Sequence, residues 1–246
     1  MNDDVSPDTA PEPDPDAEPE TELVQGRLVV LAGGTSDAGR TVARALLDAG
    51  ARVVVVGRDP ARLTEIETTI PGVQVEACDL TEAAAVDALA ARLHASEGPI
   101  DGLLHLVGGW RGGGGLAGQS DEDYAFLERS FTALRHVSRA FDADLRASAA
   151  GRLAIVSSPA VQRPLAGGAN YAAVKAASEA WTRAVAQGYS KAARDAQAPL
   201  SAASVIFRVK SLAGLETALA DAFIALWDDD AEEWNDVVVE LEPIVD

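Results

Sequence analysis

The chain contains a single cysteine, Cys78, among its 246 residues. One cysteine excludes an internal disulfide framework and a cysteine-based metal site. Its apolar, strand-like surroundings favour an ordinary buried thiol. Aromatic residues make up only 5% of the sequence, so we expect a core filled mainly by Ala, Val and Leu. His94 and His136 have no ligand partners at metal-binding spacing, and no metal site is expected.

Long apolar runs and basic residues are also scarce. No stretch approaches the roughly 18 consecutive apolar residues of a membrane helix. The start of the chain lacks the basic and apolar regions of a signal peptide, so we expect a cytoplasmic protein. The formal net charge is −19. Such a surface repels nucleic-acid phosphates and anionic lipid headgroups, and neither is an expected partner.

Residues 1–22 differ in composition from the rest of the chain. They hold nine acidic residues, five prolines and neither Lys nor Arg. A segment of this kind cannot bury enough apolar surface to offset the entropy lost on ordering, which predicts a disordered tail. Residues 23–246 are then expected to form one domain, a length that can bury a sizeable core.

Short β-branched runs alternate along this body with longer, alanine-rich segments of helical period, such as RLVVLA followed by TVARALLDAG. This alternation is typical of right-handed crossovers and of a parallel sheet covered on both faces. We therefore predict a Rossmann-type, doubly wound α/β domain with seven parallel strands. The glycine-rich stretch at residues 108–120 follows the fourth strand and is expected to be a mobile loop at the carboxyl edge, where ligands bind in such sheets.

The first strand runs into AGGTSDAGR at residues 32–40. Glycines in a strand-to-helix turn permit positive φ angles and close backbone approach, and the amino end of the helix directs N–H groups at a phosphate. The turn therefore predicts a dinucleotide-binding site. Asp37 is either a cap of the following helix or a ligand-related residue. The candidate cofactor-binding residues of the turn are Gly33, Gly34, Thr35, Ser36, Asp37 and Gly39.

A second candidate site lies further along the chain. Tyr171 and Lys175 form YAAVK, and their four-residue spacing places both side chains on one helix face. Ser158 precedes Tyr171 by thirteen residues, at the end of the strand-like GRLAIVSS. A nearby ammonium favours the phenolate form of tyrosine, and serine can hydrogen-bond the same substrate oxygen. These three residues are the candidate catalytic group, although a Y-x-x-x-K spacing alone is equally typical of helix packing.

Both regions resemble the short-chain dehydrogenase/reductase family, over about residues 27–241. The family turn reads T-G-x-x-x-G-x-G, so Ala32 stands at its threonine, and Gly33, Asp37 and Gly39 stand at its three glycines. The stretch from GRLAIVSS to NYAAVKAA resembles the family's active-site block. The resemblance implies that Tyr171 is the acid/base and that Ser158 binds the substrate oxygen. It also implies that Lys175 both tunes the tyrosine and holds the nicotinamide ribose.

The resemblance also indicates a cofactor. NAD users of the family usually carry an acid at the end of the second strand, where this chain has Gly57 followed by Arg58. A guanidinium suits a 2′-phosphate, so NADP is the expected cofactor and NAD the alternative; a solvated surface arginine is the other interpretation of Arg58. Asp79 and Leu80 match the family's adenine-contacting pair, or cap a helix. Gly108 matches the glycine after the fourth strand.

Several family positions are changed. His105, Leu106 and Val107 replace N-N-A, and His105 is either structural or in contact with the adenosine side. Ser130 stands where the family has a fourth catalytic residue, an asparagine. The proline-glycine pair and substrate-covering segment after the sixth strand are nearly absent, which leaves a more open site. Trp110 in the glycine-rich loop is either a lid residue or an exposed aromatic.

These observations predict an NADP-preferring oxidoreductase that interconverts a small-molecule carbonyl and alcohol by hydride transfer. The resemblance implies a homodimer or homotetramer in which the helices carrying residues 131–145 and 171–186 pack against their copies. The alternative is a non-catalytic scaffold that senses a nucleotide or binds a protein partner. No pattern in the sequence identifies the substrate.

Overall fold

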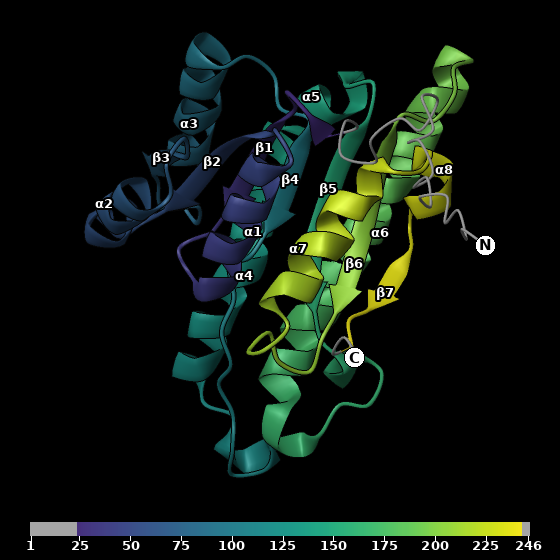
Figure 1. The fold of residues 1–246 in the computed structure, drawn as a ribbon. Helices are drawn as coiled ribbons and strands as arrows, with labels where there is room; N and C mark the ends of the chain where they lie inside the picture. Colours follow the sequence, from purple (N-terminus) through teal and green to yellow (C-terminus); the bar gives the residue numbers. More distant parts are fainter. Residues whose placement is uncertain (1–23, 243–246) are drawn as a thin grey trace, which may run out of the picture.

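A computed structural model describes residues 24–242, so the tail predicted at residues 1–22 lies outside the described residues. The described part is one α/β domain built on a seven-stranded sheet with the order β3-β2-β1-β4-β5-β6-β7 (Figure 1). Every neighbouring pair of strands is parallel. The predicted doubly wound fold with seven parallel strands is confirmed.

The strands are the β-branched runs of the sequence, and the central ones are buried along their whole length, as expected for a sheet covered on both faces. Their bounds are β1 Leu28–Ala32, β2 Arg52–Gly57, β3 Gln74–Ala77, β4 Gly102–His105, β5 Gly151–Ser157, β6 Ala202–Arg208 and β7 Val238–Glu240.

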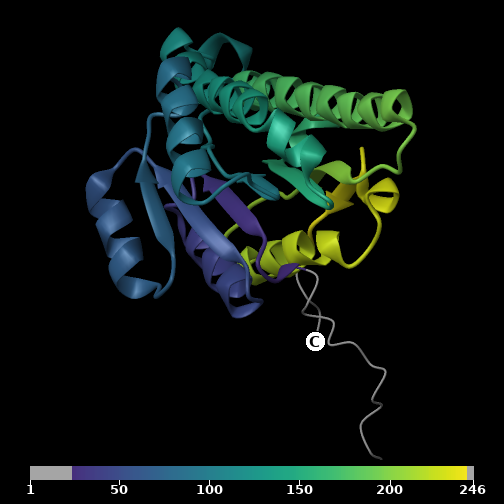
Figure 2. The ribbon, with the colours of Figure 1, turned by 90° about the horizontal axis from the view of Figure 1, so that it is seen from above.

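Helices cover both faces of this sheet. Figure 2 shows the sheet between a layer containing α4 and α6 and an opposite layer containing α1 and α7. The helices are α1 Asp37–Asp48, α2 Pro60–Thr69, α3 Ala83–Ser96, α4 Asp121–Ala140, α5 Asp142–Ala147, α6 Ala169–Ala196, α7 Glu216–Ile224 and α8 Ala231–Trp234. No helix within residues 24–242 has the length and apolar character that spanning a membrane requires.

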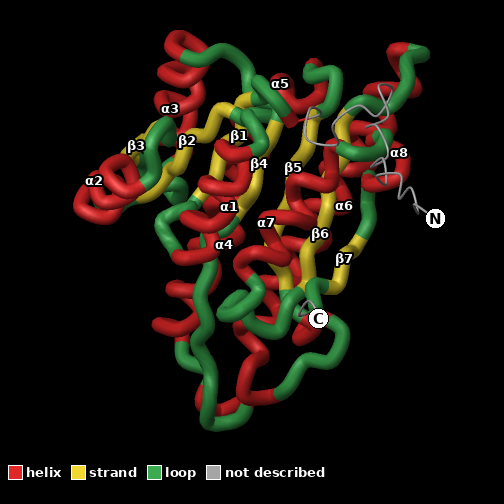
Figure 3. Tube along the Cα trace, viewed as in Figure 1, coloured by secondary structure: helices red, strands yellow, loops and turns green. Residues whose placement is uncertain are grey.

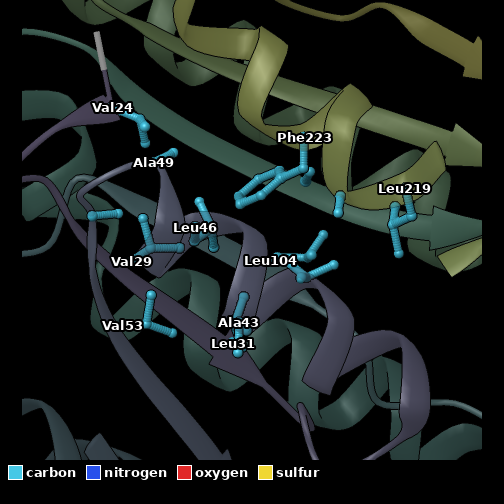
Figure 4. Close-up of a cluster of buried hydrophobic side chains, with 14 of the residues drawn as sticks. Val24, Val29, Leu31, Ala43, Leu46, Ala49, Val53, Leu104, Leu219 and Phe223 are labelled. Carbon is cyan, nitrogen blue, oxygen red and sulfur yellow. The ribbon is translucent and has the colours of Figure 1, made fainter. Parts of the chain in front are cut away.

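The core consists of two apolar clusters, one on each face of the sheet. Consecutive strand residues point to opposite faces, so Leu104 belongs to the cluster under α1 and α7, and Leu103 to the cluster under α3, α4 and α6. Figure 4 shows the first cluster, in which Leu46 of α1 and Phe223 of α7 lie over β1. Packing of the helices onto both clusters holds the sheet in place. It therefore also holds the carboxyl edge, at which the strands end.

The segment at residues 122–148, which reads as one helical pattern, forms two helices. The chain leaves helical geometry at Phe141 (φ −106°, ψ 7°), between α4 and α5. Phe141 is fully buried in the cluster under α3 and α4. Burial of this side chain where α4 ends accompanies the change of direction that starts α5.

The carboxyl ends of the strands all meet at one edge of the sheet, where two long connections project (Figure 3). One is the glycine-rich loop at residues 108–120, and the other joins β5 to α6 at residues 158–168. The connection from β6 to α7 occupies only residues 209–215. The connection after the sixth strand is therefore as short as the sequence predicts.

Candidate active site

The glycine-rich turn joins β1 to α1, and the residue that caps this helix is Ser36. Its side chain accepts a hydrogen bond from the Gly39 backbone N–H at 3.3 Å. Asp37 is the first residue of α1 and is exposed. The interpretation of Asp37 as the cap is therefore wrong, because the hydroxyl one residue earlier already satisfies the N–H group of the first turn.

Close packing explains the glycines of the turn. A Cβ on Gly39 would lie 2.2 Å from the carbonyl oxygen of Gly34, and a Cβ on Gly57 would lie 2.5 Å from Thr35 Cγ2. Gly33 has φ +81°, and its Cβ would lie 2.6 Å from Val107 Cγ2. The turn thus packs tightly between the ends of β1, β2 and β4.

A cavity of about 410 Å³ lies at this edge. Seven of the twelve predicted cofactor-binding residues line it. The other five, Gly34, Asp37, Gly39, Tyr171 and Lys175, do not. Asp37 thus lies at the exposed start of α1 and outside the lining of this cavity. The predicted residues in the lining are Gly33, Thr35, Ser36, Arg58, Asp79, Leu80 and Gly108.

Sequence reasoning missed two of the cavity's three arginines. Arg58 lies there with Arg62 of α2 and Arg129 of α4. Arg62 lies in the first turn of α2, whereas Arg58 precedes the helix, so their spacing in the sequence gave no signal of a shared cavity. The three guanidinium groups give an otherwise acidic protein a basic cavity suited to anions.

Asp79 follows β3 and does not cap a helix. Its carboxylate is instead hydrogen-bonded to a nearby residue of the same loop. Its carboxylate accepts hydrogen bonds from the backbone N–H of Thr81 at 3.0 Å and from the Thr81 hydroxyl at 2.7 Å. It also pairs with Arg129 at 3.1 Å. The hydrogen bonds from Thr81, followed by the charge of Arg129, hold the pKa of Asp79 below its usual value.

Ser158 and Tyr171 lie next to each other. Ser158 begins the short helical turn at Pro159–Val161, and its Oγ accepts a hydrogen bond from the Ala160 backbone N–H at 3.2 Å. The Ser158 hydroxyl also acts on the Tyr171 phenol, whose pKa it tends to lower. The pair thus places a donor hydroxyl and a phenol beside one another at the mouth of the site.

Lys175 lies one helical turn after Tyr171 and is buried. Its Nζ donates a hydrogen bond to the carbonyl oxygen of Val156 at 2.7 Å and lies 5.8 Å from the centroid of the Tyr171 ring. Burial lowers the pKa of Lys175 to about 8, although the charge of Glu179 opposes the change. The predicted convergence of Ser158, Tyr171 and Lys175 is therefore present in the geometry.

The pKa of Tyr171 is set mainly by burial. Burial raises the pKa of Tyr171, and only the hydrogen bond with Ser158 acts in the opposite direction. Lys175 is not among the groups that shift the pKa of Tyr171, so its effect on the tyrosine stays a prediction. Tyr171 is therefore a neutral phenol at neutral pH, a state suited to giving a proton.

A buried ion pair beneath Lys175 was not predicted. Glu179 of α6 receives two hydrogen bonds from the Arg208 guanidinium, at 2.8 and 2.7 Å, and one from the Ser157 hydroxyl at 2.7 Å. Burial raises the pKa of Glu179, but these hydrogen bonds outweigh it and the pKa falls below its usual value. The spacing of Tyr171, Lys175 and Glu179 at four-residue intervals was the signal available in the sequence.

His105 and Ser130 are neighbours at the wall of the cavity. His105 is buried at the end of β4, and its Nε2 lies 3.0 Å from the carbonyl oxygen of Ser130. Ser130 lines the cavity and donates its own hydroxyl to the Leu127 carbonyl at 2.7 Å. His105 does not line the cavity, so the geometry favours the structural interpretation over contact with adenosine.

The glycine-rich loop, predicted to be mobile, is held against the turn before α6. The Gly113 N–H donates to the Gly167 carbonyl at 2.7 Å, and the Gln119 amide donates to the same carbonyl at 3.0 Å. The Gln119 side-chain oxygen accepts from the Asn170 N–H at 3.1 Å, next to Tyr171. Trp110 remains 61% exposed. The loop therefore lies beside the candidate catalytic group.

Comparison with known proteins gives a family match over most of this domain. The sequence model of the short chain dehydrogenase family matches residues 27–193. The chain is 29% identical over 165 residues to 2,3-dihydro-2,3-dihydroxybenzoate dehydrogenase of Bacillus subtilis. That match covers 65% of this chain and 63% of the relative. It is 33% identical over 91 residues to fatty acyl-CoA reductase of Acinetobacter baylyi, covering 35% and 31%.

Solved structures share the fold over nearly the full chain. A metagenomic short-chain oxidoreductase in complex with NADP superposes with a TM-score of 0.78 and 26% identity, covering 91% of this chain and 100% of the other. A short chain dehydrogenase from Salmonella enterica serovar Typhi superposes with a TM-score of 0.80 and 20% identity, covering 92% and 100%.

Proposed function

Because the chain belongs to the short chain dehydrogenase family, we propose that it is an oxidoreductase that interconverts a carbonyl and an alcohol with NADP as cofactor. The observation that carries this proposal is the meeting of Ser158, Tyr171 and Lys175 beside the basic cavity. A scaffold without chemistry needs neither a buried ammonium next to a phenol nor a serine bonded to that phenol.

The cavity fits a phosphorylated dinucleotide. Cβ atoms on Gly33 and Gly57 would collide with Val107 and Thr35, so both turns bring bare backbone to the cavity wall. Arg58 forms no ion pair within the described residues and is exposed in the cavity. It would hold the 2′-phosphate that distinguishes NADP from NAD. The complex of the metagenomic relative with NADP supports this choice.

The remaining cofactor contacts would come from residues at the same edge. The start of α1 and the backbone of Gly33 to Ser36 would face the pyrophosphate. Asp79 and Leu80 would bind the adenine, and Gly108 with Lys175 would lie at the nicotinamide ribose. When bound, the reduced cofactor supplies a hydride to the carbonyl carbon.

The side chains of the catalytic group would handle the proton. Ser158 donates a hydrogen bond to the carbonyl oxygen of the substrate, and Tyr171, neutral because burial raises its pKa, transfers its phenolic proton to that oxygen as negative charge develops. The Lys175 ammonium then stabilises the phenolate that remains. In the opposite direction the phenolate accepts the proton of the alcohol.

Tyr171→Phe tests this assignment. On a carbonyl substrate found by screening NADPH oxidation, we expect turnover to fall at least about 100-fold, because the proton donor is lost. NADPH binding, followed by nicotinamide fluorescence, should change little. The control is Tyr124→Phe, an exposed residue at the start of α4. Full activity in Tyr171→Phe would contradict the mechanism, and binding without any turnover would favour the non-catalytic alternative.

We also propose that the subunit contact of a homodimer or homotetramer is formed by α4 and α6. These two helices lie side by side as the outer layer of one face (Figure 2). Light scattering on the purified protein gives the mass of the particle. A charge introduced on the exposed Ala180 of α6 should reduce that mass if the contact lies there, whereas the same charge at the exposed Ala61 of α2 should not.

A further inference from the structure

The imidazole of His105 holds an unpaired nitrogen in the interior. Its side chain is only 6% exposed, and Nδ1 has no hydrogen-bond partner among the described residues. The other nitrogen, Nε2, faces the Ser130 carbonyl oxygen at 3.0 Å. A carbonyl oxygen can only accept, so Nε2 must carry the hydrogen, and Nδ1 must be an acceptor with a free lone pair.

Buried acceptors without partners are rare in folded proteins because each one costs roughly 1–3 kcal/mol. The orphaned Nδ1 therefore calls for a donor. Within the described residues, the candidate donor is the ammonium of Lys175, which has three N–H groups and only one protein acceptor, the Val156 carbonyl at 2.7 Å.

Three observations place this ammonium near His105. His105 of β4 pairs in register with Ile155 of β5, the residue before Val156. A Cβ on Gly108, three residues after His105, would lie 3.8 Å from Lys175 Nζ. The Lys175 charge also acts directly on the imidazole, since burial first and this charge second lower the pKa of His105 to about 3.

We propose that His105 is a positioning residue for Lys175, whose ammonium donates a hydrogen bond to a bound water that in turn donates to His105 Nδ1. The Ser130 carbonyl fixes the tautomer, and the neutral imidazole offers its lone pair to that water. One N–H of Lys175 then donates to the Val156 carbonyl and a second donates toward His105. The third is free to donate to the cofactor. This last assignment rests on the proposed function.

The titratable and polar groups around Lys175 determine how its pKa should change in a variant. Tyr171 lies one turn before it on α6 and Glu179 one turn after it, while His105 approaches from β4 and the Val156 carbonyl from β5. An acceptor at His105 favours the charged form of Lys175. Loss of this acceptor should therefore lower the pKa of Lys175 and leave more of it neutral at a given pH.

The direct test is nitrogen-15 NMR of the histidine side chains in the free protein, which has only three histidines. We expect His105 to remain neutral from pH 5 to 9, with its hydrogen on Nε2. In Lys175→Met its Nδ1 resonance should move toward that of a free lone pair, whereas in the control Lys191→Met, an exposed lysine, it should not. Hydrogen on Nδ1, titration between pH 5 and 8, or no change in Lys175→Met would overturn the proposal.

Kinetics supply a second readout. In His105→Leu we expect the alkaline limb of the pH profile of kcat to move to lower pH by about 0.5–1 unit. His105→Asn keeps an acceptor near the Nδ1 position, so its limb should lie close to that of the wild type. A purely structural role would lower the melting temperature of both variants and leave the limb in place. The NMR measurement needs neither cofactor nor substrate, so an inactive protein with the expected spectra would refute only the proposed function.

Discussion

Arg208 and Glu179 form a two-point buried ion pair at the carboxyl end of β6, with hydrogen bonds of 2.8 and 2.7 Å between guanidinium and carboxylate. Both side chains are at most 10% exposed. Glu179 lies one turn from Lys175 on α6 and acts on its charge. The pair therefore joins the end of β6, where a substrate-covering segment is lacking, to the helix that carries the candidate catalytic group.

Replacement of Arg208 by Met leaves the Glu179 carboxylate buried without its cation. We expect the free energy of unfolding at pH 7 to fall by about 3–5 kcal/mol, measured by urea denaturation. The Glu179→Met/Arg208→Met double variant should recover most of this loss. Arg183→Met is the matched control, because Arg183 is 42% exposed and lies 4.0 Å from the same carboxylate; a loss as large as that of Arg208→Met would contradict the argument.

Lys175→Met should increase stability while removing the ammonium from the site. A pKa lowered from 10.5 to about 8 corresponds to about 3 kcal/mol of cost for the charged form in the folded state. The gain should be largest below pH 8, where the folded wild type carries the charge. It should vanish above about pH 10.5, where Lys175 is neutral in both states. Urea denaturation at pH 7 and pH 10.5 tests the sign, and a gain that grows with pH would refute it.

Arg58→Ala should weaken NADPH binding selectively. A charge-assisted hydrogen bond contributes about 1.5–3 kcal/mol, so the Kd for NADPH should rise about 10–100-fold while that for NADH changes less than about threefold. Titration monitored by tryptophan and nicotinamide fluorescence gives both values. Arg44→Ala, an exposed arginine on α1 outside the cavity, should leave them unchanged. An equal rise in the Kd for NADPH and for NADH would instead assign Arg58 a general electrostatic role.

Gln119→Ala should loosen the glycine-rich loop. The Gln119 amide donates to the carbonyl oxygens of Gly113, Gly115 and Gly167 at 3.0–3.3 Å, and these bonds hold the loop beside the site. We expect faster proteolytic cleavage within residues 108–120 and a severalfold higher KM for substrate, with a smaller effect on kcat. The exposed Gln187 of α6 provides the control substitution, Gln187→Ala. An unchanged cleavage rate would show that the backbone contacts alone hold the loop.

The order and type of the strands and helices could be predicted because both depend on local periodicity. The alternation of β-branched runs with alanine-rich helical segments is enough to predict a parallel, doubly wound sheet. The four-residue spacing of Tyr171 and Lys175 likewise fixes their shared helix face. Asp37 was misread because cap geometry depends on one backbone conformation, and Ser36 adopts the extended one (φ −82°, ψ 169°).

The sequence alone thus determined the fold class and the place of the glycine turn, since these depend on neighbouring residues, and its resemblance to a family singled out the three candidate catalytic residues. Tertiary structure alone decided which distant side chains meet: Arg129 with Asp79, Arg208 with Glu179, and the His105 imidazole with the Ser130 carbonyl. It also decided the charge states, because the pKa values of Tyr171 and Lys175 depend mainly on burial. Burial is set by the packing of α6 against β5 and β6, and no short stretch of sequence encodes it.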